Sequence, residues 1–181
     1  MRKLKNNELG RISIEEFKNA RKTPITIILD NVRSALNVGS VFRTADAFLI
    51  TKIILCGITA TPPNKAIRKA ALGSTESVAW EYAENTIDVI TNLKKEGSYV
   101  IAIEQTAHAN SLDESNLPNQ PLAIVLGNEV NGVSQEAIDK CNEVVEIPQF
   151  GTKHSLNISV EAGIVIWELW KKVINHKYSN I

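Results

Sequence analysis

The sequence predicts an α/β fold, in which a mostly parallel β-sheet is covered by helices on both faces. Two observations carry this prediction. Short apolar runs alternate along the chain with segments whose apolar residues recur at helical spacing, a pattern typical of parallel α/β sheets. The strand-like runs are also almost wholly apolar, which is expected for strands that are buried on both faces.

The first half of the chain shows helix caps, breaks and apolar runs in turn. Ser13 followed by Glu16 is a capping-box pattern and opens a short amphipathic helix. Pro24 introduces the first apolar strand, and a later helix is bounded by a Pro-Pro break and by Gly73. In order, we expect a strand at 25–29, a helix at 37–48, a strand at 52–56, a helix at 64–72 and a strand at 78–82.

The second half continues the alternation and closes with a long amphipathic helix. Gly97 ends one predicted helix, and apolar residues at helical spacing mark the last one. In order, we expect a helix at 85–96, strands at 99–103 and 122–126, a helix at 134–141, a strand at 144–147 and a helix at 157–173.

Length and composition limit the organisation of the chain. The 181 residues, 44% of them hydrophobic, suffice for one well-buried core and are too few for two full domains. We therefore expect one domain over 1–181, with a short helical extension at about 1–23. Cys56 and Cys141 belong to no CxxC pair, so neither a disulfide framework nor a zinc site is indicated. No stretch has the roughly 18 apolar residues of a membrane span, and we expect a cytoplasmic protein.

Charge is unevenly distributed although the formal net charge is zero. Residues 1–70 carry 13 Lys and Arg against 5 Asp and Glu, whereas residues 71–181 carry 7 against 15. This asymmetry permits a local basic surface that meets phosphates. Interleaving of the two halves in the fold would instead average the charges, and the sequence leaves both alternatives open.

Ligands of open parallel sheets bind beyond the carboxyl ends of the strands, so chemistry is expected in the loops that follow them. The first such loop, residues 30–43, brings polar groups to the start of a helix, where backbone N–H groups favour an anion such as a phosphate. Arg43 adds a forked donor that grips phosphate oxygens in two bonds. The alternative is that Asn37 caps the helix and Arg43 lies on the surface.

The second loop, residues 127–134, follows an apolar strand. Gly127 and Gly132 allow close approach of a ligand, and the peptide groups between them suit an adenine or a ribose. Glu129 offers a hydrogen-bond acceptor to amide or ribose groups. The loop carries neither a GxGxxG fingerprint nor a P-loop ending, and an ordinary turn capped by Ser134 is the alternative.

The third loop, residues 148–159, leads from a strand into the last helix. We expect Ser155 or Asn157 to cap that helix, while backbone groups around Ile147 and Leu156 are placed to hold a cofactor. His154 has neither a triad-like context nor metal-ligand spacing around it, so we do not expect it to be a catalyst. No metal site is expected.

Together the three loops resemble the SpoU, or TrmH-like, branch of the SPOUT RNA methyltransferases. The segment NVGSVFRTADAF is similar to the first motif of that family, LGNEVNG to the second and IPQFGTKHSLNISVEAGI to the third, in the order of the family. The resemblance runs from about Pro24 to the C-terminus. It implies an α/β domain with a C-terminal trefoil knot that forms a pocket for S-adenosylmethionine, and a homodimer that completes the site.

The resemblance also implies roles for individual residues in methyl transfer to a ribose 2′-hydroxyl of tRNA or rRNA. Arg43 matches the catalytic arginine and Asn37 supports it. Since the pKa of arginine is above about 12, we expect Arg43 to orient a phosphate and stabilise the developing alkoxide rather than to act as base. The further active-site polar residues are Glu129, Ser155 and Asn157, and the cofactor-binding residues are Gln105, Gly127, Asn128, Ile147 and Leu156.

Two other functions are alternatives to this interpretation. A catalytically silent RNA-binding protein on the same fold is the main alternative, against which the intact polar residues of the three motifs argue. A nicotinamide-dependent oxidoreductase would need a glycine-rich turn after the first strand, and DNVRSALN at 30–37 lacks it. Glu161 departs from the family pattern by placing a charge where the last helix is commonly small and apolar. A surface position would explain it.

Overall fold

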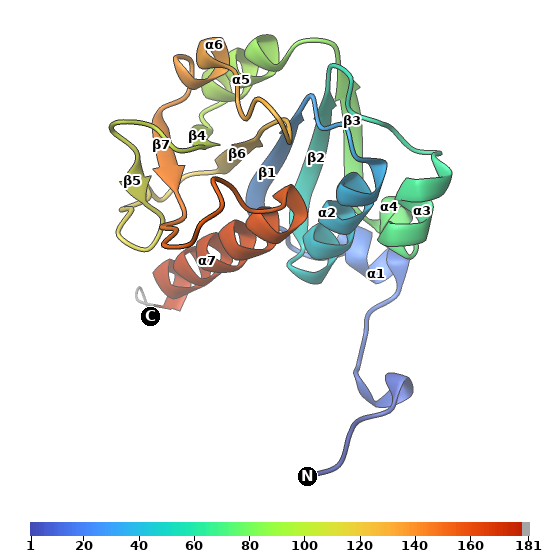
Figure 1. Ribbon diagram of the computed structural model, residues 1–181. Helices are drawn as coiled ribbons and strands as arrows, with labels where there is room; N and C mark the ends of the chain where they lie inside the picture. Colours follow the sequence, from blue (N-terminus) through green and yellow to red (C-terminus); the bar gives the residue numbers. More distant parts are fainter. Residues whose placement is uncertain (179–181) are drawn as a thin grey trace.

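The computed structural model describes residues 1–178 and shows one seven-stranded sheet within them, with strand order β3-β2-β1-β6-β4-β7-β5. All neighbouring strands run parallel (Figure 1). The strands are β1 (Thr23–Asp30), β2 (Ile50–Cys56), β3 (Ala79–Ala83), β4 (Tyr99–Ile103), β5 (Asn110–Ser111), β6 (Leu122–Leu126) and β7 (Glu143–Glu146). The predicted parallel sheet is confirmed.

Helices cover both faces of this sheet. They are α1 (Ile14–Asn19), α2 (Ala35–Ala47), α3 (Lys65–Ala71), α4 (Ser74–Ser77), α5 (Thr86–Lys95), α6 (Gln135–Ile138) and α7 (Ile158–Tyr178), preceded by the 3-10 turn η1 (Asn6–Glu8). The helices α1, α2, α3 and α7 contribute to one buried cluster, and α5 and α6 to a second on the other face. The segment before α1 extends away from the body (Figure 1).

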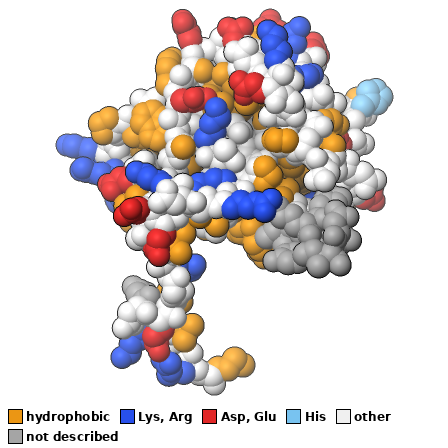
Figure 2. All heavy atoms as spheres, turned by 180° about the vertical axis from the view of Figure 1, so that it is seen from behind, with side chains coloured by type: hydrophobic (Ala, Val, Ile, Leu, Met, Phe, Trp, Pro, Cys, Tyr) orange, Lys and Arg blue, Asp and Glu red, His pale blue; other side chains and the backbone are white. Residues whose placement is uncertain are grey.

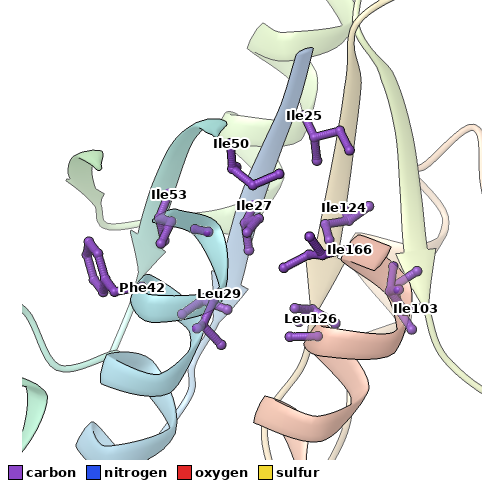
Figure 3. Close-up of a cluster of buried hydrophobic side chains, with 14 of the residues drawn as sticks. Ile25, Ile27, Leu29, Phe42, Ile50, Ile53, Ile103, Ile124, Leu126 and Ile166 are labelled. Atoms are coloured by element: carbon purple, nitrogen blue, oxygen red, sulfur yellow. The ribbon is translucent and has the colours of Figure 1, made fainter. Parts of the chain in front are cut away.

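The larger core cluster lies between the sheet and helices α2 and α7. Figure 3 shows isoleucine and leucine side chains of four neighbouring strands pointing toward Phe42 of α2 and Ile166 of α7. Ile27 and Ile124, at the centre of this cluster, have no solvent exposure. Alternate residues of the same strands, such as Ile28 and Val125, enter the cluster on the opposite face. This two-sided burial explains why the strands read as continuous apolar runs.

The predicted elements are all present, with differences of a few residues at the ends of several of them. The Ser13 and Glu16 capping box is confirmed, since each side chain accepts a hydrogen bond from the other residue's backbone N–H. Helix α6 ends at Ile138 rather than at 141, because the Lys140 and Cys141 N–H groups donate three residues back and close tighter turns. The turn η1, helix α4 and strand β5 were not predicted. The trefoil knot stays a prediction.

Candidate active site

A pocket of about 520 Å³ lies at the carboxyl ends of β4, β6 and β7, beside the start of α7. This is the edge at which ligands of parallel sheets bind. Loops that are far apart in the sequence build it. The predicted site residues that line it are Gln105, Gly127, Asn128, Glu129, Ile147, Ser155, Leu156 and Asn157. Asn37 and Arg43, which were also predicted to belong to the site, do not line the pocket.

The loop after β6 is held in shape by its own backbone and by Asn128. The Asn128 and Gly132 backbones hydrogen-bond to each other in both directions, at 2.9 and 3.0 Å. The Asn128 side chain donates to the Asn31 carbonyl at 2.7 Å and accepts from the Val130 N–H at 2.8 Å. A Cβ on Gly127 would lie 2.2 Å from the Gly132 carbonyl carbon. Glycine is therefore required at 127 for the loop to close on itself.

Glu129 ties this loop to the start of α2. Its carboxylate accepts hydrogen bonds from the Arg33 and Ser34 N–H groups, both at 2.9 Å, and from Asn37 Nδ2 at 3.3 Å. Burial by itself would raise the pKa of Glu129, but the hydrogen bonds from Arg33 and Ser34 outweigh it and lower the pKa below its ordinary value. The carboxylate stays ionised and holds the α2 N-terminus against the pocket loop.

Asn37 extends this contact to the third loop. The Asn157 Nδ2 donates to the Asn37 Oδ1 at 3.3 Å, so Asn37 bridges Glu129 and Asn157. The three loops singled out in the sequence therefore meet at one hydrogen-bonded point. Asn37 does not cap the helix, which was the alternative role for this residue. The cap is Ser34, whose side chain accepts a hydrogen bond from the Asn37 N–H at 3.3 Å.

The loop before α7 lies across the pocket. Asn157 Oδ1 accepts from the Ser159 N–H at 3.0 Å, which confirms the expected capping by Asn157. The Gln105 side chain donates to the His154 carbonyl at 2.7 Å and links this loop to the end of β4. Leu156 is half-buried and Ser155 is exposed at the rim. The pocket thus has polar edges and apolar contacts from Ile147 and Leu156.

Arg43 lies away from the pocket on an exposed face of α2. It is six residues beyond Asn37, which places it about 9 Å further along the helix axis and on a different side of the helix. Its side chain forms no hydrogen bond or ion pair with the described part of the chain. The same face of α2 carries Leu36, seven residues earlier, which is 53% exposed.

Sequence reasoning missed the acidic character of the pocket. Glu104, Glu146 and Glu161 line it in addition to Glu129. Both oxygens of Glu104 accept backbone hydrogen bonds, from the Gln105 and Val133 N–H groups, at 2.9 Å each. Glu161 is half-buried rather than on the surface, so the surface explanation was wrong. Burial, followed by the negative charge of Glu104, raises the pKa of Glu161 to about 7.

The described residues form neither a metal-binding cluster nor a helix that could cross a membrane. Within 1–178, no three His, Cys, Asp or Glu side chains gather closely enough to hold a metal ion. None of the helices in the same range combines the length and apolar character that a membrane crossing requires.

The model of the SpoU rRNA Methylase family matches residues 24–167, most of the chain. The chain belongs to this family. The match includes all three loops singled out in the sequence, the whole of α2 and the first half of α7.

The 23S rRNA (guanosine-2′-O-)-methyltransferase RlmB of Neisseria meningitidis is 32% identical over 152 residues, which are 84% of this chain and 60% of that protein. The AdoMet-bound rRNA methyltransferase of Sinorhizobium meliloti has a TM-score of 0.77 at 25% identity, over 87% of this chain and 60% of the other. The A. aeolicus TrmH/SpoU tRNA modifying enzyme shares the fold, with a TM-score of 0.80 at 23% identity, over 91% and 84%. The chain spans about three fifths of the first two relatives.

Proposed function

We propose that this SpoU family chain transfers a methyl group from S-adenosylmethionine to a ribose 2′-hydroxyl of tRNA or rRNA, as a cytoplasmic homodimer built from one domain over 1–181. The observation that carries the proposal is the junction of Glu129, Asn37 and Asn157. It joins the three loops of the family at the rim of one pocket. The Neisseria relative supports ribose 2′-O-methylation by its name, and the Sinorhizobium structure supports the cofactor.

The pocket fits the proposed cofactor in size and charge. Its volume lies within the range of about 300–1,000 Å³ that small-molecule sites occupy. Among residues 1–178, the lining contributes four carboxylates and neither Lys nor Arg, which favours a cationic ligand over the anionic pyrophosphate of a dinucleotide. Peptide groups of the Gly127 and Leu156 loops are available to the adenosine, with Gln105, Asn128 and Ile147 around it. S-adenosylmethionine supplies an electrophilic methyl group on a sulfonium, so no metal is needed.

Arg43 acts on the RNA in this proposal. Its guanidinium grips a phosphate beside the target ribose and stabilises the alkoxide that develops as the hydroxyl loses its proton. Ser155 and Asn157 lie at the pocket rim and orient the ribose there. Figure 2 shows Lys and Arg side chains across the lower body on the face opposite to the view of Figure 1, with Asp and Glu side chains beside them at one end.

A homodimer explains why Arg43 does not line the pocket of its own chain. On α7, Val160, Ile164 and Trp167 are 51%, 40% and 48% exposed and recur at helical spacing, so they form one apolar face that starts at the pocket. Large apolar residues of this kind are typical of subunit interfaces. Docking of this face onto a second copy brings the exposed face of α2, with Leu36 and Arg43, toward the pocket of the other protomer.

The cofactor is tested by isothermal titration calorimetry. We expect binding of S-adenosylmethionine and of S-adenosylhomocysteine and no binding of NAD. NAD binding without any response to S-adenosylmethionine would overturn the proposed function. RNA binding without methyl transfer, measured on small RNA with radiolabelled cofactor, would favour the catalytically silent alternative.

Mixed dimers test the contribution of Arg43 from the partner. Arg43→Ala and Asn157→Ala each inactivate a different half of the site, so either homodimer is expected to have little activity. In heterodimers made by co-expression, one site keeps both residues, and statistical mixing restores about a quarter of parental activity. A mixture no more active than the two separate variants would refute action in trans. A monomeric mass by light scattering in an active preparation would refute the dimer.

A further inference from the structure

Glu161 is a carboxyl group that the described fold does not use. It lies in the first turn of α7, is half-buried and lines the pocket. Its side chain makes no hydrogen bond or ion pair with the described residues. Glu104, by contrast, lies nearby with both oxygens bonded to backbone N–H groups. Glu161 is therefore the carboxyl group of this pair that is free to meet a ligand.

The surroundings of Glu161 disfavour its charge in the absence of a ligand. Burial removes water from the carboxylate, and the charge of Glu104 repels it. The other titratable groups that line the pocket are Glu129, Glu146 and His154. Together with Glu104 these are three carboxylates and one histidine, so the described chain supplies little positive charge to balance Glu161. A ligand with a positive group would remove this unfavourable arrangement.

We propose that Glu161 determines specificity in the cofactor pocket by contacting a cationic group at the methionine end of bound S-adenosylmethionine. The cationic group is either the sulfonium or the amino acid ammonium, and both carry the charge that the pocket lacks. This inference rests on the proposed function. It assigns Glu161 to recognition of the cofactor charge, whereas the loops at Gly127 and Leu156 hold the adenosine.

A structural role for Glu161 is the competing explanation. A carboxylate in the first turn of a helix interacts favourably with the helix dipole. Such a role would change the stability of the fold but would not distinguish charged from uncharged ligands of the same pocket. Comparison of ligands that differ only at the methionine end therefore separates the two explanations.

The test is calorimetric binding to the full chain, with three ligands. S-adenosylmethionine carries both cationic groups, S-adenosylhomocysteine carries the ammonium alone, and 5′-methylthioadenosine carries neither. Four variants are compared with the parent: Glu161→Gln, Glu161→Ala, Glu161→Asp and, as matched control, Glu168→Gln. Glu168 is on the same helix and pairs with Lys171 at 2.8 Å.

We expect Glu161→Gln and Glu161→Ala to weaken S-adenosylmethionine binding about tenfold to a hundredfold, the range of a hydrogen bond to a charged group. Methylthioadenosine binding should change less than twofold, Glu161→Asp should recover part of the loss, and Glu168→Gln should match the parent. An equal loss for S-adenosylhomocysteine identifies the ammonium as the contact, and a loss confined to S-adenosylmethionine identifies the sulfonium.

Two results would overturn the inference. One is S-adenosylmethionine binding by Glu161→Gln within twofold of the parent. The other is an equal loss for methylthioadenosine, which would indicate general damage to the pocket. If the parent protein bound none of the three ligands, the proposed function itself would fail, and that outcome is distinguishable because it appears before any substitution is made.

Discussion

Substituting Glu161 by Gln is expected to stabilise the ligand-free protein at pH 8 and to change little at pH 4.5. The pKa of Glu161 is raised from 4.5 to about 7 in the folded chain, because burial and Glu104 disfavour its ionised form. Between these two values the folded protein holds this proton more tightly than the unfolded chain. The free energy of unfolding therefore falls as the pH rises through this window. Gln carries no charge at any pH and removes this dependence.

The size of the effect follows from the pKa difference. One pKa unit corresponds to about 1.4 kcal/mol, so the full difference sets an upper limit of roughly 3 kcal/mol. Glu161 is half-buried in a pocket that opens to solvent, and water screens part of the repulsion. We expect Glu161→Gln to raise the free energy of unfolding by about 1–2 kcal/mol at pH 8.

The assay is urea unfolding of the parent, Glu161→Gln and Glu168→Gln at pH 4.5, 6 and 8. Other carboxyl groups also titrate, and the pKa of Glu129 is lowered by its hydrogen bonds. Because they are present in all three proteins, the difference between variant and parent isolates position 161. A difference that is constant with pH, or a loss of stability by Glu161→Gln at pH 8, would refute the reasoning.

Three further substitutions test the site. Arg43→Lys keeps the charge but loses the fork, so single-turnover methylation should fall about a hundredfold to a thousandfold with unchanged cofactor affinity; a near-normal rate would contradict the proposed role. Gly127→Ala places a Cβ 2.2 Å from backbone atoms, so it should lower the free energy of unfolding in urea by more than about 2 kcal/mol. In the control Gly151→Ala the new Cβ meets nothing within 4 Å, so the free energy of unfolding should not change. Glu129→Gln should lower the free energy of unfolding by about 1–2 kcal/mol, because its amide group opposes a backbone N–H; unchanged unfolding would mean that these bonds contribute little.

The sheet could be predicted from the sequence because strands that are buried on both faces are continuous apolar runs. Residues 99–103 and 122–126 are predicted and observed with the same bounds, since every position there faces a core or a neighbouring strand. The shortest elements have no such pattern in their sequence. Strand β5 has two residues and exists only through its pairing with β7, and α4 spans a single turn after Gly73. Both depend on contacts that no local pattern encodes.

The candidate site was likewise predicted in part. Loops with glycine and polar residues directly after apolar strands were visible in the sequence, and Gly127 and Asn157 line the pocket as expected. Glu104 was not found and Glu161 was assigned to the surface, because a single acid at a strand end or in a helix is ordinary in any chain. Their proximity arises only when the fold brings positions 57 residues apart to one pocket.

The helix α2 is the element through which the two halves of the proposed chemistry are joined. Its N-terminus is fixed to the pocket by Glu129 and Asn37, and it exposes Arg43 on another side about 9 Å further along. A helix of 13 residues packed against α3 and α7 forms a rigid link between these two points. In the proposed dimer, the loops that hold the cofactor in one protomer therefore set the position of the arginine that serves the other.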